Sequence, residues 1–346
     1  MADFENDKLY YRDNPSLRRE GIKNWEFEDW QEEEFAKCIV DPIYFIRNYV
    51  KIINVDEGLV LFDMHDYQEE MVNAFHNNRF SIVRIGRQSG KTTTTVGYLL
   101  WLTLFSENFS IAITANKKSL ATEILSRYQL AYENLPMWIQ QGVKIWNKGS
   151  IELENGCKIL AASTAARSIR GGSFNLVFMD EFAHVHNNLA EDFFTSTYPV
   201  ISSGKTTKII IVSTPRGMNL YYRMWMDAIN GKSDYFPVDI HWSRVPGRDE
   251  TWKEMTIRNT SLRQFNQEFE CNFLGSTNTL IDGTKLATLV AIDPLDTDTE
   301  QFNGMTIPSE MDVFIPPIKE SFDPEDRKST RLNSSHTDIS RMPSSA

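Results

Sequence analysis

The sequence has little cysteine and no long apolar run, and each shortage excludes a class of protein. Its three cysteines, Cys38, Cys157 and Cys271, are odd in number and far apart, so they match neither a disulfide framework nor a zinc site. Such sparing use of cysteine is typical of a reducing cytoplasm. No apolar stretch approaches the roughly 18 residues that a membrane-spanning helix needs. The charged residues 1–8 also lack the apolar core of a signal peptide, so we expect no membrane attachment.

Basic charge is scarce as well. The chain carries 36 Lys and Arg against 47 Asp and Glu, which gives a formal net charge of −11. A protein of this charge is not held to nucleic acid by bulk attraction, so any contact with DNA must be local. The 346 residues suit one large domain or two, and a hydrophobic content of 41% supplies a sizeable core.

The most informative segment lacks a glycine where the usual phosphate-binding loop has one. Residues 81–85 form a short apolar run with β propensity, and a helix-like segment begins near residue 91. The standard pattern G-x-x-x-x-G-K-[ST] places glycine at position 85, but this chain has Ile85 there, and Gly86 comes one residue late. The strand–loop–helix context still predicts a loop whose N–H groups, with the helix N-terminus, bind a polyphosphate. The predicted nucleotide-binding residues of this loop are Arg87, Gln88, Ser89, Gly90, Lys91, Thr92 and Thr93.

Three side chains of the loop have predicted roles in binding or hydrolysing ATP. Lys91 would reach the β- and γ-phosphates, and Thr92 would offer its hydroxyl to Mg²⁺. Arg87 would either stabilise charge on the transferring phosphoryl group, as an arginine finger in cis, or contact phosphate in the ground state. The sequence does not separate these two roles of Arg87.

A pair of carboxylates supplies the second half of the predicted site. Asp180 and Glu181 directly follow the apolar run Leu176–Met179. At the carboxyl end of a strand, Asp180 would hold Mg²⁺, and Glu181 would polarise the attacking water as general base. The alternative is a buried strand that simply ends in solvated acids. The phosphate-binding loop upstream favours the catalytic interpretation, and a strand between the two motifs is typical of P-loop enzymes with a catalytic glutamate.

Three further motifs fit the same site, and each has a plainer alternative. Tyr67 and Gln68 lie on the helix before the loop strand, where an amide and an aromatic ring would bind adenine, although Gln68 would also suit an ordinary surface. Ser213 and Thr214, followed by Pro215, end the last strand and would sense the γ-phosphate, or form a simple turn. The segment 167–172 carries two arginines that would touch DNA or a neighbouring subunit, or remain solvated.

Alternating strand-like and helix-like segments over residues 59–240 predict an α/β fold. We expect a P-loop NTPase core of the RecA/ASCE type, with a mostly parallel sheet flanked by helices. Four short, dense apolar runs are expected as strands covered on both faces: Ile82–Ile85, Phe109–Ala115, Leu176–Met179 and Lys208–Ser213.

Two local details are also predicted. A helix after the second strand should bury Leu120, Ile124, Tyr128 and Ala131, with Asn116 or Ser119 as its N-cap. The alternating residues 150–160 should form a β-hairpin with a type I′ turn at Asn155-Gly156.

The remaining segments are assigned by composition. Residues 1–58 and 241–285 are expected to be the two parts of a small, mainly helical subdomain. Residues 286–328 are acidic and proline-bearing, as in a linker. Residues 329–346 hold six serines and no periodic apolar face, which predicts a disordered tail of non-native origin.

With these motifs in place, the chain resembles the large terminase subunit of tailed bacteriophages, of the T-even myovirus type. The resemblance covers roughly residues 20–328 and includes runs that are not general P-loop features, such as 146–153, 199–204 and 275–281. The family has a variant loop with an arginine near its start, which accounts for Arg87 and the late glycine. The resemblance implies that Lys91, Thr92, Asp180 and Glu181 serve Mg-ATP hydrolysis. It also assigns Gln68 to adenine and residues 213–215 to coupling.

The resemblance further implies a DNA-packaging motor. Such proteins drive double-stranded DNA into a procapsid in the host cytoplasm, assemble as a homo-oligomeric ring on the portal protein, and work with a small terminase subunit. Family members continue into an RNase H-like nuclease domain. Here the similarity stops near residues 326–328, so we expect no nuclease activity from these 346 residues.

Two other functions would use some of the same motifs. A superfamily-2 helicase or translocase shares the glutamine motif, the loop and the Asp-Glu pair, but no second RecA-like half with an arginine motif is recognisable after Ser213. A non-hydrolysing ATP-binding assembly module is the other alternative. Glu181 argues against it, because a switch that does not hydrolyse ATP needs no general base.

Overall fold

An eight-stranded sheet forms the centre of the chain. The computed structural model describes residues 9–22, 26–164, 172–202 and 204–274, which all lie within one compact unit, Met1–Ala287. The strand order is β12-β5-β11-β10-β6-β9-β8-β7. In chain order the strands are β5 (Phe80–Ile85), β6 (Ser110–Ala115), β7 (Val143–Trp146), β8 (Ser150–Leu153), β9 (Lys158–Ser163), β10 (Leu176–Asp180), β11 (Lys208–Ser213) and β12 (Phe236–Ile240).

The sheet is mostly parallel, as the sequence predicts. All neighbours from β12 to β9 pair in parallel, and only β8 and β7 are antiparallel. All four predicted strands are present. Strand β11 lies between β5 and β10, so the carboxyl ends of these three parallel strands meet at one edge of the sheet.

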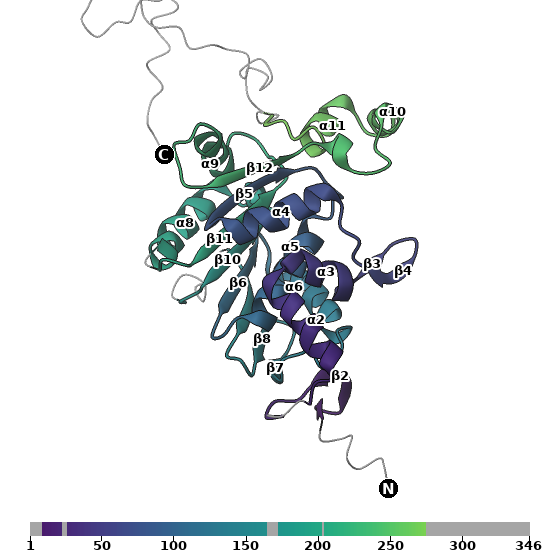
Figure 1. The fold of residues 1–346 in the computed structure, drawn as a ribbon. Coiled ribbons are helices and arrows are strands. Elements are labelled where there is room, and N and C mark those ends of the chain that lie inside the picture. Colours follow the sequence, from purple (N-terminus) through teal and green to yellow (C-terminus); the bar gives the residue numbers. More distant parts are fainter. Residues whose placement is uncertain (1–8, 23–25, 165–171, 203, 275–346) are drawn as a thin grey trace, which may run out of the picture. The chain divides into compact units, whose positions relative to one another are not determined.

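Helices cover both faces of the sheet (Figure 1). Two hydrophobic clusters lie on opposite faces, and strand residues alternate between them: Ile209 and Ile211 belong to one, Ile210 and Val212 to the other. Helices α2 to α6 contribute to the first cluster, and α8 and α9 to the second. The helices are α2 (Asp29–Val40), α3 (Pro42–Tyr49), α4 (Asp66–Asn77), α5 (Lys91–Phe105), α6 (Lys118–Glu133), α8 (Asn187–Ser202), α9 (Leu220–Ile229), α10 (Glu250–Asn259) and α11 (Leu262–Glu268).

Short elements complete the fold. They are the strand pairs β1 (Tyr10–Tyr11) with β2 (Asn14–Arg18) and β3 (Lys51–Asn54) with β4 (Gly58–Leu61), and the 3₁₀ helices η1 (Phe182–His184) and η2 (Trp242–Arg244). Within the described ranges, no helix is long and apolar enough to cross a membrane.

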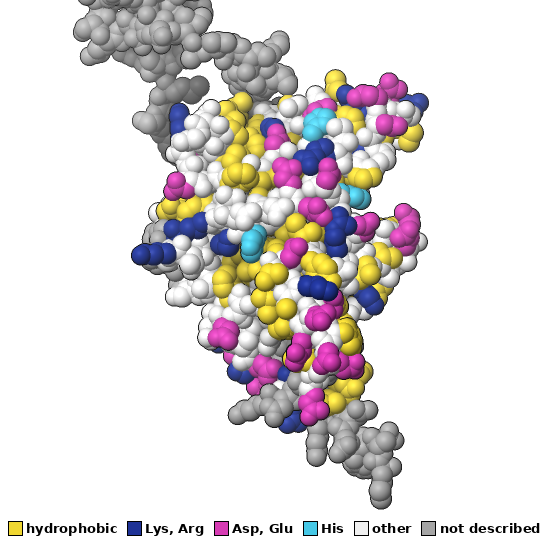
Figure 2. Space-filling view, viewed as in Figure 1, with side chains coloured by type: hydrophobic (Ala, Val, Ile, Leu, Met, Phe, Trp, Pro, Cys, Tyr) yellow, Lys and Arg dark blue, Asp and Glu magenta, His cyan; other side chains and the backbone are white. Residues whose placement is uncertain are grey.

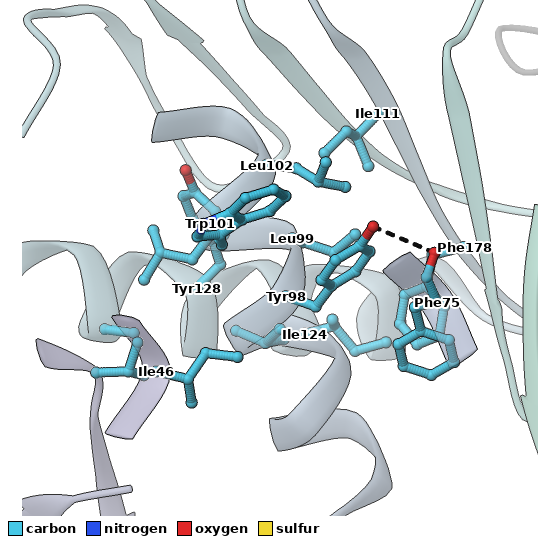
Figure 3. Packing of buried hydrophobic residues seen from close by; sticks show 14 of the residues in the cluster. Ile46, Phe75, Tyr98, Leu99, Trp101, Leu102, Ile111, Ile124, Tyr128 and Phe178 are labelled. Carbon is cyan, nitrogen blue, oxygen red and sulfur yellow. Dashed lines mark hydrogen bonds between the residues drawn. The ribbon is translucent and has the colours of Figure 1, made fainter. Parts of the chain in front are cut away.

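Helix α5, which follows the phosphate-binding loop, is almost wholly buried. Figure 3 shows Tyr98, Leu99 and Trp101 of this helix packed among side chains from α3, α4, α6 and the sheet, such as Ile46 and Ile124. The Tyr98 hydroxyl donates to the Phe75 carbonyl at 3.2 Å, which satisfies the buried polar end of the ring. A helix fixed on all sides gives its first residues, Lys91 and Thr92, a rigid base.

The predicted details of helix α6 are partly wrong. Leu120 is exposed, and the buried stripe instead begins at Ala121. The N-cap is Lys117, without a side-chain cap, so neither Asn116 nor Ser119 caps the helix. The Asn116 Oδ1 atom is buried without a hydrogen-bond partner at the edge of the nucleotide cavity described below. The chain therefore uses Asn116 to line that cavity instead of capping the helix.

The hairpin of β8 and β9 is present, but its turn is not type I′. A type I′ turn needs positive φ at both central residues, and of the pair only Gly156 has it, at 81°. The Gly156 N–H donates to the Leu153 carbonyl, and the Leu153 N–H donates to the Cys157 carbonyl. These bonds describe a three-residue loop with a left-handed glycine at its end, which places one more residue in the turn than predicted.

The two segments expected to share a subdomain contact different elements. Helices α2 and α3 belong to the cluster that covers α5, whereas residues 241–274 reach α4 and the phosphate-binding loop. The subdomain boundaries therefore remain predictions. The predicted linker and tail, 286–328 and 329–346, lie outside the described residues.

Candidate nucleotide-binding site

The phosphate-binding loop joins β5 to α5, and its conformation depends on glycine at position 90. Gly90 is the N-cap of α5 with φ 72°, a left-handed conformation that other residues adopt at a cost. A Cβ atom there would lie 2.4 Å from Gln68 Nε2. Gln88 also has positive φ, 55°, without being glycine. This backbone directs the N-terminus of α5, with its free N–H groups, to the carboxyl edge of the sheet.

Two polar contacts link the loop to the end of β10. The Lys91 ammonium donates to Glu181 Oε1 at 2.7 Å, and the Thr92 hydroxyl donates to Asp180 Oδ2 at 3.2 Å. Both lysine and aspartate are buried. A cavity of 290 Å³ opens beside them, and its lining includes Arg87, Thr92, Asp180 and Glu181. The structure thus brings together the loop and the carboxylate pair that the sequence places 89 positions apart (Lys91 to Asp180).

The residues at the cavity fit a magnesium ion. Asp180 Oδ1 is buried without a hydrogen-bond partner, and a buried oxygen with free lone pairs is what a cation ligand requires. Its other oxygen is in contact with the Thr92 hydroxyl. Magnesium is usually held by one or two protein groups, with substrate phosphates and water completing its shell. Thr92 and Asp180 would be those protein groups.

Asp180 predicts an unusual pH dependence for the protein without metal. Burial raises the pKa of Asp180 from 3.8 to about 6, because the charged carboxylate is poorly solvated there. The folded state therefore binds this proton more tightly than the unfolded chain does. This tighter proton binding adds about 2–3 kcal/mol to the free energy of unfolding. The contribution is complete below pH 4 and is lost as pH rises through 6.

Replacing Asp180 should therefore stabilise the metal-free protein at neutral pH. We expect Asp180→Asn in EDTA to raise Tm by several degrees at pH 7.5, with the gain shrinking as pH falls through 6. Differential scanning calorimetry at a series of pH values measures this. Asp192→Asn, which replaces an exposed carboxylate on α8, is the matched control and should leave Tm close to wild type. A lower Tm for Asp180→Asn at pH 7.5 would contradict the argument.

Glu181 is held from the opposite side by the end of β11. Its Oε2 accepts from the Thr214 N–H at 3.2 Å, from the Thr214 hydroxyl at 3.0 Å and from the Ser213 hydroxyl at 3.4 Å. Burial opposes ionisation of Glu181, but the adjacent Lys91 ammonium outweighs it and holds the pKa below its usual value. Glu181 also has φ 51°, a strained conformation for a residue with a side chain. Ser213 and Thr214 thus lie in contact with the predicted general base.

Tyr67 and Gln68 contact the loop backbone in this structure. The Tyr67 hydroxyl and the Gln68 amide both donate to the Ser89 carbonyl, at 3.1 and 3.3 Å. Gln68 Oε1 accepts from the His65 N–H at 2.9 Å, and both side chains are buried. Tyr67 and Gln68 thus lie beside the loop, as the sequence predicts. Their contact with adenine remains a prediction, and it requires the Gln68 amide to exchange its present partners.

A family comparison identifies the kind of protein to which this site belongs. The family described as "Terminase large subunit, T4likevirus-type, N-terminal" matches residues 82–288, which include the loop, the carboxylate pair and the end of β11. The chain belongs to this family.

Solved terminase structures share the fold at low sequence identity. The large terminase of bacteriophage HK97 has a TM-score of 0.56 at 18% identity, over 67% of this chain and 54% of that one. The large terminase ATPase domain of Thermus phage P74-26 has a TM-score of 0.52 at 18% identity, over 61% of this chain and 94% of that domain. This terminase chain therefore spans about half the length of the HK97 protein but nearly all of an ATPase domain.

Arg87 is paired with a residue that sequence reasoning missed. The Arg87 guanidinium contacts the Glu268 carboxylate at the end of α11. The backbone N–H of Arg87 donates to the backbone carbonyl of Glu268 at 3.0 Å. Arg87 also lines the nucleotide cavity. Both of its roles, in the transition state or in the ground state, stay predictions. The basic segment 167–172 is mostly outside the described residues.

Arg248 is a second residue that sequence reasoning missed. Its Nη2 donates to the carbonyls of Arg87 and Gln88, at 3.0 and 2.9 Å, and its guanidinium lies over the rings of Trp252 and Phe269, 4.8 and 5.5 Å from their centroids. These bonds reach from the segment before α10 to the loop, 160 residues earlier. Arg248 therefore supports the strained backbone at Gln88 from outside the cavity.

We expect Arg248→Met to weaken ATP binding by about 10- to 100-fold, because it removes two charge-assisted bonds to carbonyls that contribute about 1.5 kcal/mol each. Methionine keeps an unbranched side chain against the rings of Trp252 and Phe269 but removes both bonds. Isothermal titration with a non-hydrolysable ATP analogue measures the change. Arg258→Met, which removes an exposed arginine from α10, is the matched control. Equal affinity in Arg248→Met and wild type would show that the loop does not depend on these bonds.

Proposed function

We propose that this terminase chain hydrolyses Mg-ATP at the edge formed by β5, β10 and β11. The observation that supports this most strongly is the pair of contacts Lys91–Glu181 and Thr92–Asp180, at 2.7 and 3.2 Å. They place a metal-binding hydroxyl and carboxylate and a general base around one cavity, with a phosphate-binding cation in contact with that base. Bound Mg²⁺ would neutralise charge on the β- and γ-phosphates.

The present contacts suggest how the site changes when nucleotide binds. A polyphosphate that takes up Lys91 draws the ammonium away from Glu181. The Glu181 carboxylate then loses the cation that lowers its pKa, and it becomes a stronger base. Thr214 and Ser213 still hold its Oε2, so the other oxygen is free to orient a water molecule toward the γ-phosphate.

We propose that ATP hydrolysis here drives double-stranded DNA into a procapsid. The chain would act as a ring of subunits on the portal protein in the host cytoplasm, with DNA delivered by a small terminase subunit. Family membership supports this role. On the face shown in Figure 2, basic and acidic side chains of the described residues are interspersed, in keeping with local DNA contacts.

A packaging assay tests this function. Linear DNA, the full chain and procapsids carrying the cognate portal are incubated with Mg-ATP, and DNase-resistant DNA is measured. We expect protected DNA with ATP and none with a non-hydrolysable analogue. If ATP is hydrolysed but no DNA is protected under these conditions, the DNA-packaging function is contradicted. The chain would then be an ATPase with another role.

A further inference from the structure

His184 lines the nucleotide cavity and contacts the predicted coupling residues. It ends η1, three positions after Glu181, and its side chain is 13% exposed. Its Nε2 lies 2.9 Å from the Thr214 hydroxyl, and its Nδ1 lies 3.3 Å from Arg216 Nη1. The imidazole therefore joins an exposed arginine to the threonine that holds the general base.

Hydrogen-bond chemistry assigns a direction to this chain of contacts. Arg216 has only donors, so His184 Nδ1 must accept and Nε2 carries the proton of the neutral ring. Nε2 then donates a hydrogen bond to the Thr214 hydroxyl oxygen. The same hydroxyl donates a hydrogen bond to Glu181 Oε2 at 3.0 Å. If the Thr214 hydroxyl instead donated to Nε2, lone pairs of the threonine oxygen and of Glu181 Oε2 would face each other. The Glu181 carboxylate would then lose one hydrogen bond.

Backbone contacts hold the imidazole in place. The Ala183 N–H donates to the Ser213 hydroxyl at 3.1 Å, and the Asn219 amide donates to the Ala183 carbonyl at 2.7 Å. Residues 182–184 are thus attached to the loop that follows β11. Burial lowers the pKa of His184, which favours the neutral ring that the bonding pattern needs.

We propose that His184 is a positioning residue for the catalytic glutamate. By donating to Thr214, it orients the threonine hydroxyl toward Glu181 and fixes the carboxylate during hydrolysis. Because its hydrogen bond is to Thr214 and not to a residue that binds phosphate, its loss lowers kcat and leaves nucleotide affinity unchanged. The inference rests on the proposed ATPase function.

Four variants of the full chain test this role by ATP turnover and by titration with a non-hydrolysable analogue. We expect His184→Ala to lower kcat about tenfold, the factor that corresponds to one lost hydrogen bond, with unchanged affinity. His184→Gln, which keeps an N–H donor near the Nε2 position, should recover most of the activity. Adding Thr214→Val to His184→Ala should cause no further loss beyond that of Thr214→Val alone. His186→Ala, two residues away on the surface, is the control.

Each other outcome overturns the proposal. Turnover of His184→Ala within twofold of wild type shows that the bond is dispensable. A loss that glutamine does not recover, or one additive with Thr214→Val, shows that His184 does not act through the threonine. If Glu181→Gln also leaves turnover intact, the proposed ATPase site is wrong as a whole. If Glu181→Gln lowers turnover but the His184 variants do not, only the inference about His184 is wrong.

Discussion

Glu181→Gln is expected to lower ATP turnover by about 100- to 10,000-fold while ATP binding survives. Glutamine has the size of glutamate and still accepts from Thr214, but it cannot take a proton from water. Loss of the charge next to Lys91 also favours the bound polyphosphate, so affinity should stay equal or rise. Single-turnover hydrolysis and equilibrium titration, measured on the same preparation, separate the two effects.

Glu33→Gln is the matched control for this experiment. Glu33 is an exposed carboxylate on α2 and does not line the cavity, so its loss should leave turnover near wild type. Unchanged turnover in Glu181→Gln would remove the general base from the account. The non-hydrolysing ATP-binding module would then be the better description of the chain.

Lys91→Ala is expected to abolish nucleotide-stimulated activity and to weaken ATP binding. Lys91 is the cation nearest the catalytic glutamate, and its side chain is 10% exposed. Alanine removes the contact with the phosphates. It also leaves the partly buried Glu181 carboxylate without its charged partner, and this unpaired negative charge further repels a polyphosphate.

The Lys91→Ala effect is measured by phosphate release and by titration with ATP. Lys118→Ala, an exposed lysine in the first turn of α6, controls for a general change of charge. A circular dichroism melt shows whether the variant remains folded. Folded Lys91→Ala protein that still hydrolyses ATP would refute the assignment of the loop.

The main features of the site could be predicted from the sequence because they depend on local patterns. A dense apolar run marks a buried parallel strand, and the residues directly after such runs meet at one edge of the sheet. Asp180, Glu181 and Ser213 follow this rule, Lys91 begins the helix after such a strand, and the structure brings the four residues together.

The residues that were missed depend on contacts between distant segments. Arg248 and Glu268 reach the loop from more than 150 residues away, and nothing in their local sequence marks them. His184 ends the 3₁₀ helix η1, which is too short to show a period in the sequence. Leu120 shows a different limit: Ile124, Tyr128 and Ala131 of the predicted α6 stripe are buried, but in the first turn Ala121 takes the buried position and Leu120 is exposed.

The most direct test of the account is the crystal structure of Glu181→Gln bound to Mg-ATP. We predict the β- and γ-phosphates against Lys91 and the loop N–H groups, with Mg²⁺ about 2.1 Å from the Thr92 hydroxyl oxygen and Asp180 beside it. Lys91 should have left residue 181, while Thr214 remains bound to it. Nucleotide bound elsewhere, or a magnesium ion without contact to Thr92 and Asp180, would contradict the central claim that this sheet edge is the ATPase site.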